Sequence, residues 1–312
     1  MDTSPHTATR IRQSVIAVPP LARDEEGGVS AAENAKIIRH LESGGVNILL
    51  YGGNAVFYHV RPTEFRSILQ MLASTVAKTT SVVPSVGPAF GMMMDQAEVL
   101  RDFDFPTAMI LPQRDIADPA GIVRGVRAFA DAFGKPVVLY LKFPNWLPTA
   151  AVRTLVDEGL ISWIKYAVVQ EDPAEDLELR ALVDAVSPEK IISGIGEQPA
   201  IVHLRDFGVA GFTSGCVCIA PSRSMEMLAA LREERWDDAE EIRRQFEPLE
   251  DLRNQINPIR VLHEAVFSAG IARTGPIPPL LGLLEDEDQD TAIATAASRL
   301  LSWEREQTPR TA

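Results

Sequence analysis

The chain is poor in cysteine, in basic charge and in long apolar runs. Its 312 residues include two cysteines, and 43 acidic residues outnumber 30 basic ones, which gives a formal net charge of −13. Two cysteines are too few for a disulfide framework and fit a reducing compartment. The negative charge disfavours binding to nucleic acid or to anionic membranes, and no apolar run approaches the roughly 18 residues of a membrane-spanning helix. We therefore expect neither a secreted, a membrane nor a DNA-binding protein.

Signals of several other protein classes are also missing. The first ten residues contain no apolar segment of a secretory signal, so we expect a cytoplasmic protein. There is no GxSxG elbow and no GxxxxGK[ST] phosphate loop. The five histidines show no metal-ligand spacing, and we expect neither a metal nor a cofactor. Cys216 and Cys218 lack a second cysteine pair or a nearby histidine, which favours two buried thiols over a metal site.

Apolar residues make up 46% of the chain and form short runs that alternate with helix-like segments. Most of these runs are continuous and do not alternate with polar residues, which is typical of strands covered on both faces. The eight predicted strands are Ser14–Val18, Asn47–Leu50, Val82–Val86, Ala108–Leu111, Val137–Leu141, Trp163–Val169, Ile191–Gly194 and Gly211–Ser214.

The number of these runs predicts the fold class. Eight strands with intervening helices in roughly 235 residues match an α/β protein with a (β/α)8 barrel (TIM barrel). A doubly wound sheet is the alternative, but the glycines of Gly194–Gly196 are not followed by the third glycine of its phosphate-binding fingerprint. After about Met225 the pattern is helical only. We therefore expect a barrel catalytic domain over residues 10–225 and a C-terminal helical domain over residues 226–312, packed on the barrel or on another subunit.

Lys165 is the most informative residue, because lysine is rare inside an apolar strand unless it is paired or put to use. If its run is the sixth strand, period-two alternation can point Lys165 into the barrel. A desolvated amine there has a lowered pKa and can attack a carbonyl. The alternative is a lysine whose stem is buried while its ammonium group reaches solvent.

Two further segments could act with this lysine. Tyr140 ends the preceding predicted strand and could relay protons, or it could be a core tyrosine with a satisfied hydroxyl. Tyr51-Gly52-Gly53-Asn54 follows the second predicted strand, and its paired glycines let backbone N–H groups approach a ligand carboxylate. The alternative is a plain turn between a strand and a helix.

Together these residues resemble the dihydrodipicolinate synthase/N-acetylneuraminate lyase family of class I aldolases, from about residue 14 to about residue 284. The Schiff-base lysine of the family's IxGIKxx motif corresponds to Lys165, and the tyrosine of its YNxP motif corresponds to Tyr140. Three further motifs, SGxD, GxxGxIS and NPIPxK, match Ser193-Gly194, Gly208–Ser214 and Asn257-Pro258-Ile259-Arg260 in the same order.

The resemblance implies that Lys165 condenses with a pyruvate-type 2-oxo acid to form an imine, which acts as an electron sink. Tyr140 would be the general acid and base, and Gly52, Gly53 and Asn54 would bind the carboxylate. Thr213, inside the GxxGxIS match, is a further substrate-binding candidate. The family also implies a homo-oligomer, a dimer or a tetramer, with a small-molecule substrate as its partner.

The departures from the family pattern narrow the prediction. The family's GTTGE loop reads Tyr51–Ala55 here and lacks both hydroxyl residues. The aromatic residue lent by a neighbouring subunit aligns near Arg114, and the arginine after the fifth strand aligns with Asn145, which leaves Lys142 as the nearest cation. Arg114 and Lys142 are therefore candidate anchors for an anionic substrate. Tyr51, Tyr166 and Cys218 could line the pocket or simply pack.

These changes disfavour dihydrodipicolinate synthase itself and sialic acid lyase. The sequence predicts a catabolic Schiff-base lyase, either a retro-aldolase or a dehydratase of a 2-oxo acid such as a 2-keto-3-deoxy sugar acid. The alternatives are a synthase-like condensation of pyruvate with an aldehyde and a non-catalytic relative that binds a small acid. A metal-dependent barrel aldolase is a weaker alternative, because no ligand cluster is visible in the sequence.

Overall fold

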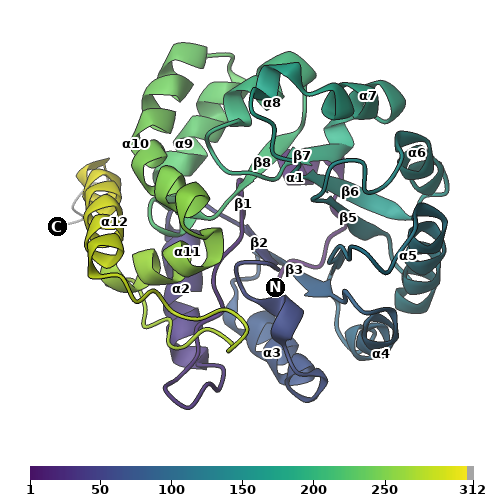
Figure 1. The fold of residues 1–312 in the computed structure, drawn as a ribbon, viewed down its shortest axis with the longest axis horizontal. Coiled ribbons are helices and arrows are strands. Elements are labelled where there is room, and N and C mark those ends of the chain that lie inside the picture. Colours follow the sequence, from purple (N-terminus) through teal and green to yellow (C-terminus); the bar gives the residue numbers. More distant parts are fainter. Residues whose placement is uncertain (308–312) are drawn as a thin grey trace.

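The computed structural model describes residues 1–307, and these form a closed barrel of eight parallel strands paired in sequence order. The barrel closes where β8 pairs with β1, and helices surround it (Figure 1). This confirms the predicted (β/α)8 fold. The strands are β1 Ile16–Ala17, β2 Ile48–Tyr51, β3 Ser81–Val86, β4 Met109–Ile110, β5 Val137–Leu141, β6 Ile161–Tyr166, β7 Ile191–Ser193 and β8 Gly211–Ser214.

The strands form where the continuous apolar runs predict them. Every residue of β2, β3 and β5 is buried, because one face of each strand meets the barrel interior and the other meets the helices. The sixth strand is displaced from its predicted position: it begins at Ile161 and ends at Tyr166, and Val169 is 73% exposed. The displacement leaves Lys165 next to the last residue of the strand.

The helices of the ring are α2 Ala31–Ser43, α3 Pro62–Thr75, α4 Phe90–Leu100, α5 Pro119–Phe133, α6 Thr149–Asp157, α7 Leu177–Ala185, α8 Ala200–Phe207 and α9 Pro221–Arg232. Local signals fix their ends. The Ser30 hydroxyl accepts a hydrogen bond from the Glu33 N–H (3.4 Å) at the start of α2, and Gly44 and Gly45 follow its last turn, the latter with φ of +86°.

The C-terminal extension consists of α10 Trp236–Gln255, α11 Pro258–Ser268 and α12 Glu287–Gln307, on one side of the barrel (Figure 1). It is docked on α9: the Glu304 carboxylate of α12 accepts hydrogen bonds from the Ser222 N–H and hydroxyl (3.0 and 2.7 Å). The Arg223 guanidinium lies 4.3 Å from the centroid of the Trp303 ring. The extension thus packs on the barrel, one of the two predicted arrangements. The predicted division between residues 225 and 226 falls inside α9.

The N-terminal residues, which include α1 Ala8–Arg12, lie at the end of the barrel where the strands begin. The Asp2 N–H donates to the Thr80 carbonyl (2.8 Å), beside the first residue of β3. The Trp163 indole N–H donates to His6 Nδ1 (3.2 Å), so that His6 Nε2–H faces the Ser81 hydroxyl (2.7 Å). The chain therefore covers this end of the barrel with its own first residues. The other end, at the carboxyl ends of the strands, is the one at which barrel enzymes carry their sites.

Within the part of the chain that the structure describes, no helix combines the length and the apolar character needed to cross a membrane.

Candidate active site

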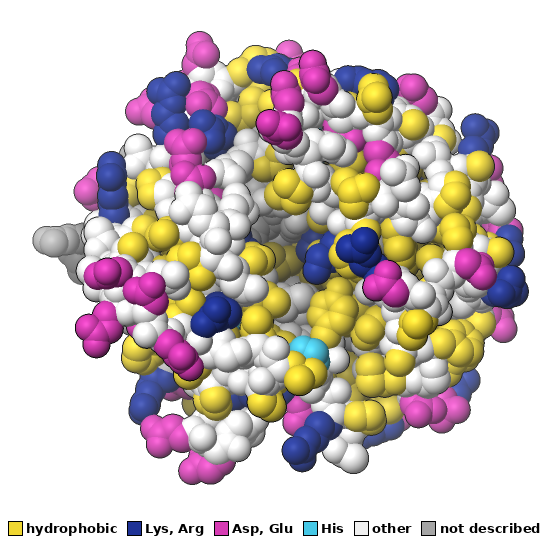
Figure 2. Space-filling model, in the orientation of Figure 1, with side chains coloured by type: hydrophobic (Ala, Val, Ile, Leu, Met, Phe, Trp, Pro, Cys, Tyr) yellow, Lys and Arg dark blue, Asp and Glu magenta, His cyan; other side chains and the backbone are white. Residues whose placement is uncertain are grey.

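A cavity of about 210 Å³ opens at the carboxyl ends of the strands. Figure 2 shows the hollow at the centre of this face, with Lys and Arg side chains at its edge. The lining residues come from the strand ends, the loops after them and the extension: Val18, Gly53, Asn54, Tyr140, Lys142, Lys165, Ala167, Val169, Gly194, Ile195, Gly196, Thr213, Gly215, Arg253, Asn254, Pro258 and Ile259. Six of the eight residues predicted for the site are among them.

Lys165 points into this cavity from β6. It is only 6% exposed, and its Nζ lies 4.7 Å from the centroid of the Tyr140 ring, the register partner on β5. It forms no ion pair with a carboxylate of the described chain. Burial, together with the positive charges of Lys142 and Arg253, lowers the pKa of Lys165 to about 7. A large fraction of the amine is therefore neutral and nucleophilic near neutral pH.

Tyr140 lies beside this amine at the end of β5. It is 8% exposed, and its hydroxyl makes no hydrogen bond within the described chain. Burial raises the pKa of Tyr140, so that the phenol keeps its proton. The satisfied core tyrosine considered for this position is not what the structure shows, because the hydroxyl is left for a ligand.

The loop after β2 presents two backbone donors to the cavity. The N–H groups of Gly53 and Asn54 donate to no group of the described chain. The loop is held from two sides, since Asn54 Nδ2 donates to the Val18 carbonyl (2.8 Å) and His263 Nε2–H of α11 donates to the Asn54 carbonyl (2.9 Å). Burial lowers the pKa of His263 to about 4, so that the ring is neutral. A pair of fixed, unpaired N–H groups is suited to a carboxylate.

Gly52 was predicted to bind the carboxylate, but it does not line the cavity. It is packed against β3 and β4, since a Cβ at this position would come within 2.8 Å of Met109 Cε and 3.0 Å of Ser85 Oγ. The Ser85 hydroxyl is buried and has no hydrogen-bond partner in the described chain, and the same holds for the Tyr51 hydroxyl. The loop has lost its own hydroxyl residues, but a hydroxyl of β3 occupies the adjoining space.

The two predicted anchors lie in different places. Lys142 lines the mouth of the cavity, with Nζ 5.8 Å from the centroid of the Tyr58 ring, and partial burial lowers its pKa. Arg114 is exposed outside the cavity, with its guanidinium 4.7 Å from the centroid of the Phe143 ring. Arg114 was expected to act across a subunit contact, and that role stays a prediction.

The packing alternative holds for the three residues whose role was left open. Tyr51 is fully buried against Phe57, and Cys218 is a buried free thiol, as is Cys216. Tyr166 follows Lys165 and so faces outward, where its hydroxyl bonds both carboxylate oxygens of Asp176 (2.9 and 2.7 Å). The prediction of buried thiols is confirmed.

Arg253 of α10 is the residue that sequence reasoning missed. It is 9% exposed, and its Nε donates to the Pro258 carbonyl (3.2 Å). Gly215 makes room for it: a Cβ there would lie 2.6–2.8 Å from the guanidinium atoms. A signal was present, because Arg253 continues the buried helical spacing of Ile242, Phe246 and Leu249.

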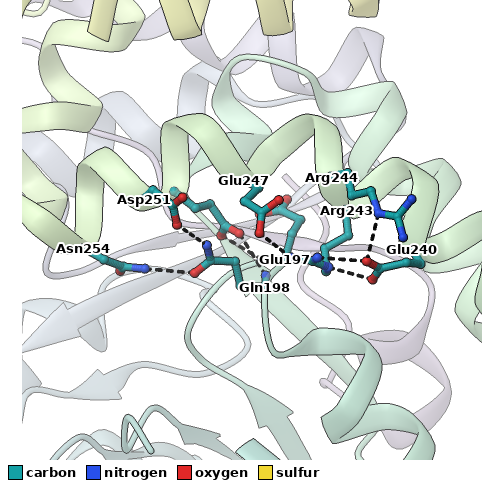
Figure 3. A network of polar contacts seen from close by, with 9 residues as sticks. Glu197, Gln198, Glu240, Arg243, Arg244, Glu247, Asp251 and Asn254 are labelled. Carbon is teal, nitrogen blue, oxygen red and sulfur yellow. Dashed lines mark hydrogen bonds and ion pairs between the residues drawn. The ribbon is translucent and has the colours of Figure 1, made fainter. Parts of the chain in front are cut away.

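One turn before Arg253 on α10, Glu250 is buried against the loop after β7. Figure 3 shows the neighbouring polar contacts between this loop and α10, among them those of Gln198 with Asp251 and Asn254. The two carboxylate oxygens of Glu250 accept hydrogen bonds from the N–H groups of Glu197 and Gln198 (both 2.9 Å). Glu197 in turn accepts from the hydroxyls of Ser214 and Ser224 (2.8 and 2.7 Å). Burial raises the pKa of both carboxyls, that of Glu250 well above its usual range.

Fold and site together define a (β/α)8 barrel whose carboxyl-end cavity holds a buried, nucleophilic lysine beside a protonated tyrosine. No protein-family model and no curated protein matches the sequence. Solved structures do match. A dihydrodipicolinate synthase from Bacillus clausii aligns with 95% of this chain and 99% of its own, at a TM-score of 0.83 and 21% identity.

Two other solved structures show the same likeness. A sialic acid aldolase from Ruminococcus gnavus covers 95% of this chain and 100% of its own (TM-score 0.82, 14% identity). A prophage protein of the dihydrodipicolinic acid synthase family from E. coli K12, in complex with pyruvate, covers 92% and 98% (TM-score 0.79, 22% identity). The chain has the fold of the dihydrodipicolinate synthase and sialic acid aldolase structures.

Proposed function

We propose that this chain is a divergent member of the dihydrodipicolinate synthase/N-acetylneuraminate lyase family and a Schiff-base lyase that acts on a 2-oxo acid. The observation that carries the proposal is the amine of Lys165: it is buried in the cavity beside Tyr140, with a pKa lowered to about 7 and no carboxylate paired to it. The likeness to the fold of lysine-imine enzymes supports it.

In the proposed reaction, the neutral amine of Lys165 adds to the C2 carbonyl of the 2-oxo acid. Loss of water then leaves an iminium. The unpaired N–H groups of Gly53 and Asn54 bind the C1 carboxylate, and the hydroxyl of Thr213 lies in the same cavity. Tyr140 supplies the proton for the departing water and later exchanges protons with the leaving group.

The iminium accepts the electron pair released when a bond near it breaks. In aldol cleavage the C3–C4 bond breaks and the C4 hydroxyl gives up its proton. In dehydration C3 loses a proton and the C4 hydroxyl departs as water. Both outcomes use the same lysine and tyrosine, and a 2-keto-3-deoxy sugar acid offers both bonds. Hydrolysis of the imine then frees Lys165 for the next turnover.

Borohydride trapping with pyruvate tests the proposal. We expect one reduced pyruvyl group per chain, mapped by mass spectrometry to the peptide that contains Lys165. Lys165→Met should abolish the adduct, whereas Lys78→Met, which removes an exposed lysine far from the cavity, should leave it unchanged. If the folded wild-type protein gains thermal stability with pyruvate but yields no adduct, the enzyme proposal is wrong and the protein is a small-acid-binding protein.

The pH dependence of trapping gives a second test. Imine formation needs the free amine, so its rate should rise as the pH is increased from 6 to 8 and level off above the pKa of Lys165, about 7. A rate that keeps rising towards pH 10 would show that the amine has its ordinary pKa.

We also propose a homo-oligomer, as the family resemblance implies. Phe90 and Ile116 are 53% and 80% exposed on the face that carries Arg114, and apolar side chains in such positions are common at subunit contacts. Light scattering should give a mass of two or four chains. A monomeric mass would count against the oligomer and against any role of Arg114 across an interface.

A further inference from the structure

The charge of the cavity differs from that of the whole chain. Of its 17 lining residues, Lys142, Lys165 and Arg253 are basic, and none is an aspartate, a glutamate or a histidine. The whole chain carries a formal net charge of −13. A 2-oxo acid with a single carboxylate, already bound by the N–H groups of Gly53 and Asn54, would leave this positive charge largely uncompensated.

Arg253 is buried but keeps donors of its guanidinium that no carboxylate or carbonyl of the described chain fills. Its Nε is taken by the Pro258 carbonyl, Nη1 has only a long contact to Cys216 Sγ (3.9 Å), and Nη2 makes no hydrogen bond within the described chain. No carboxylate of the described residues forms an ion pair with it. A buried guanidinium without a counter-ion is unfavourable, so its position in a cavity wall requires a reason.

Glu250 and Glu197 attract Arg253 through space and raise its pKa, but neither accepts a hydrogen bond from it or forms a direct ion pair with it. Both oxygens of Glu250 accept hydrogen bonds from backbone N–H groups, and both oxygens of Glu197 accept from serine hydroxyls. The pKa of Glu250 is raised well above its usual range, which favours its neutral form. No carboxylate occupies the Nη1–Nη2 edge of Arg253, where Nη2 makes no hydrogen bond and Nη1 makes only the long one to Cys216 Sγ, so this edge can bind an anion that arrives with a ligand.

The fold separates this edge from the amine and from the carboxylate loop. Lys165 comes from β6, the unpaired N–H groups follow β2, and Arg253 packs against Gly215 after β8. The planar edge of a guanidinium matches the two oxygens of a carboxylate. We propose that the substrate is a 2-oxo acid with a second carboxylate and that Arg253 binds this second carboxylate. This inference rests on the proposed function, since it names the substrate class of the same cavity.

The test measures the concentration that gives half-maximal borohydride trapping for two 2-oxo acids of equal chain length. These are 2-oxoglutarate, which has a second carboxylate, and 2-oxopentanoate, which has none. The wild-type protein should reach half-saturation at a lower concentration of 2-oxoglutarate, by about 10- to 100-fold. Arg253→Met should remove this preference, and Arg253→Lys should restore part of it. The preference is read as the ratio of the two half-saturating concentrations, because the loss of Arg253 also acts on the pKa of Lys165 and so on trapping of every 2-oxo acid. Lys142→Met shows whether the cation at the mouth contributes instead.

Two results would overturn the proposal. Equal half-saturation for both acids in the wild-type protein would show that no second carboxylate is recognised. An equal rise for pyruvate and 2-oxoglutarate in a folded Arg253→Met protein would show that Arg253 binds the C1 carboxylate or only supports the fold.

A measurement without imine formation separates this proposal from the proposed function. In Lys165→Met, glutarate should raise the melting temperature more than butyrate does, and the difference should vanish in Lys165→Met/Arg253→Met. This result would support the anion site even if the wild-type protein formed no adduct. Equal shifts by the two acids would overturn the site even if trapping succeeds.

Discussion

Glu250 and Arg253 lie one turn apart on α10, and both are buried, but their surroundings differ. The Glu250 carboxylate accepts hydrogen bonds from two backbone N–H groups, and its neighbour Glu197 is satisfied by two serines (Figure 3 shows the adjoining network). Arg253 faces the cavity with Nη2 unpartnered, as Lys165 does with its amine. Hydrogen-bond completeness thus distinguishes buried polar groups that hold the structure from those available to a ligand.

The comparison divides the polar groups into two regions. The cavity wall holds Lys165, Tyr140 and the N–H groups of Gly53 and Asn54, all without partners in the described chain. The network behind it holds the loop after β7 against α10. A change in the wall should therefore alter chemistry more than stability, and a change in the network should do the reverse.

The largest effect is expected at Lys165. Lys165→Met removes the proposed nucleophile and should lower turnover by a factor on the order of 10⁴ or more. The free energy of unfolding should stay equal or rise, because an unpaired buried amine is replaced by an apolar side chain of similar length. Steady-state kinetics and urea unfolding measure the two effects. A clear loss of stability would show that Lys165 holds the structure, and would contradict the distinction between the cavity wall and the network behind it.

The opposite result is expected at Glu250. Glu250→Ala leaves the buried N–H groups of Glu197 and Gln198 without an acceptor, and should lower the free energy of unfolding by about 2–4 kcal/mol. The matched control is Glu247→Ala on the same helix, which loses a partly exposed ion pair with Arg243 and should change stability by less than about 1 kcal/mol. Equal losses of unfolding free energy in the two variants would show that the buried contacts of Glu250 contribute no more to stability than a partly exposed ion pair.

The two glycines of the carboxylate loop offer a finer comparison. Gly52→Ala forces a Cβ against Met109 and Ser85 and should destabilise the fold by about 1–3 kcal/mol. Gly53→Ala meets no atom within 4 Å, so its stability should be nearly unchanged. Its effect should appear instead in the half-saturating concentration of pyruvate. Thermal melting of the pair checks this, and similar melting temperatures would contradict it.

The smallest effect concerns a histidine outside the cavity. His203 is buried, its Nδ1 lies 2.8 Å from the Ser193 hydroxyl, and burial lowers its pKa from 6.5 to about 4. Between these values the unfolded chain binds a proton that the folded protein does not, so stability falls as the pH is lowered. From pH 7 to pH 5 this amounts to about 1–2 kcal/mol.

The buried carboxyls Glu197 and Glu250 have raised pKa values and act in the opposite direction, so the measurement must be a difference. Urea unfolding of the wild-type protein and of His203→Gln at pH 7 and at pH 5 isolates the histidine. The wild-type protein should lose more stability on acidification than the variant does. Equal losses would show that His203 keeps an ordinary pKa in the folded protein.

The fold and part of the cavity wall could be predicted from the sequence, because both depend on local patterns of residues. Eight apolar runs predicted the barrel, and a lysine inside one of them predicted an amine inside it, which the structure places in the cavity beside Tyr140. Helical spacing marks Arg253 as buried but does not show that it reaches the cavity, and Ser85 carries no such signal. Both side chains lie in space left by Gly215 and Gly52, which are 38 and 33 positions away in the chain, and no local pattern reports that a missing Cβ there makes room for a distant side chain.

The segment around His6, which covers the end of the barrel where the strands begin, has a consequence for the order in which the protein folds. His6 rests on Ser81 and Trp163, 75 and 157 positions further along the chain. During synthesis the segment around His6 therefore has no surface to dock on until β3 and β6 exist. Closing a contact over such a long stretch of chain costs conformational entropy before the contact can stabilise anything. We therefore expect this segment to dock after the strands of the barrel have paired.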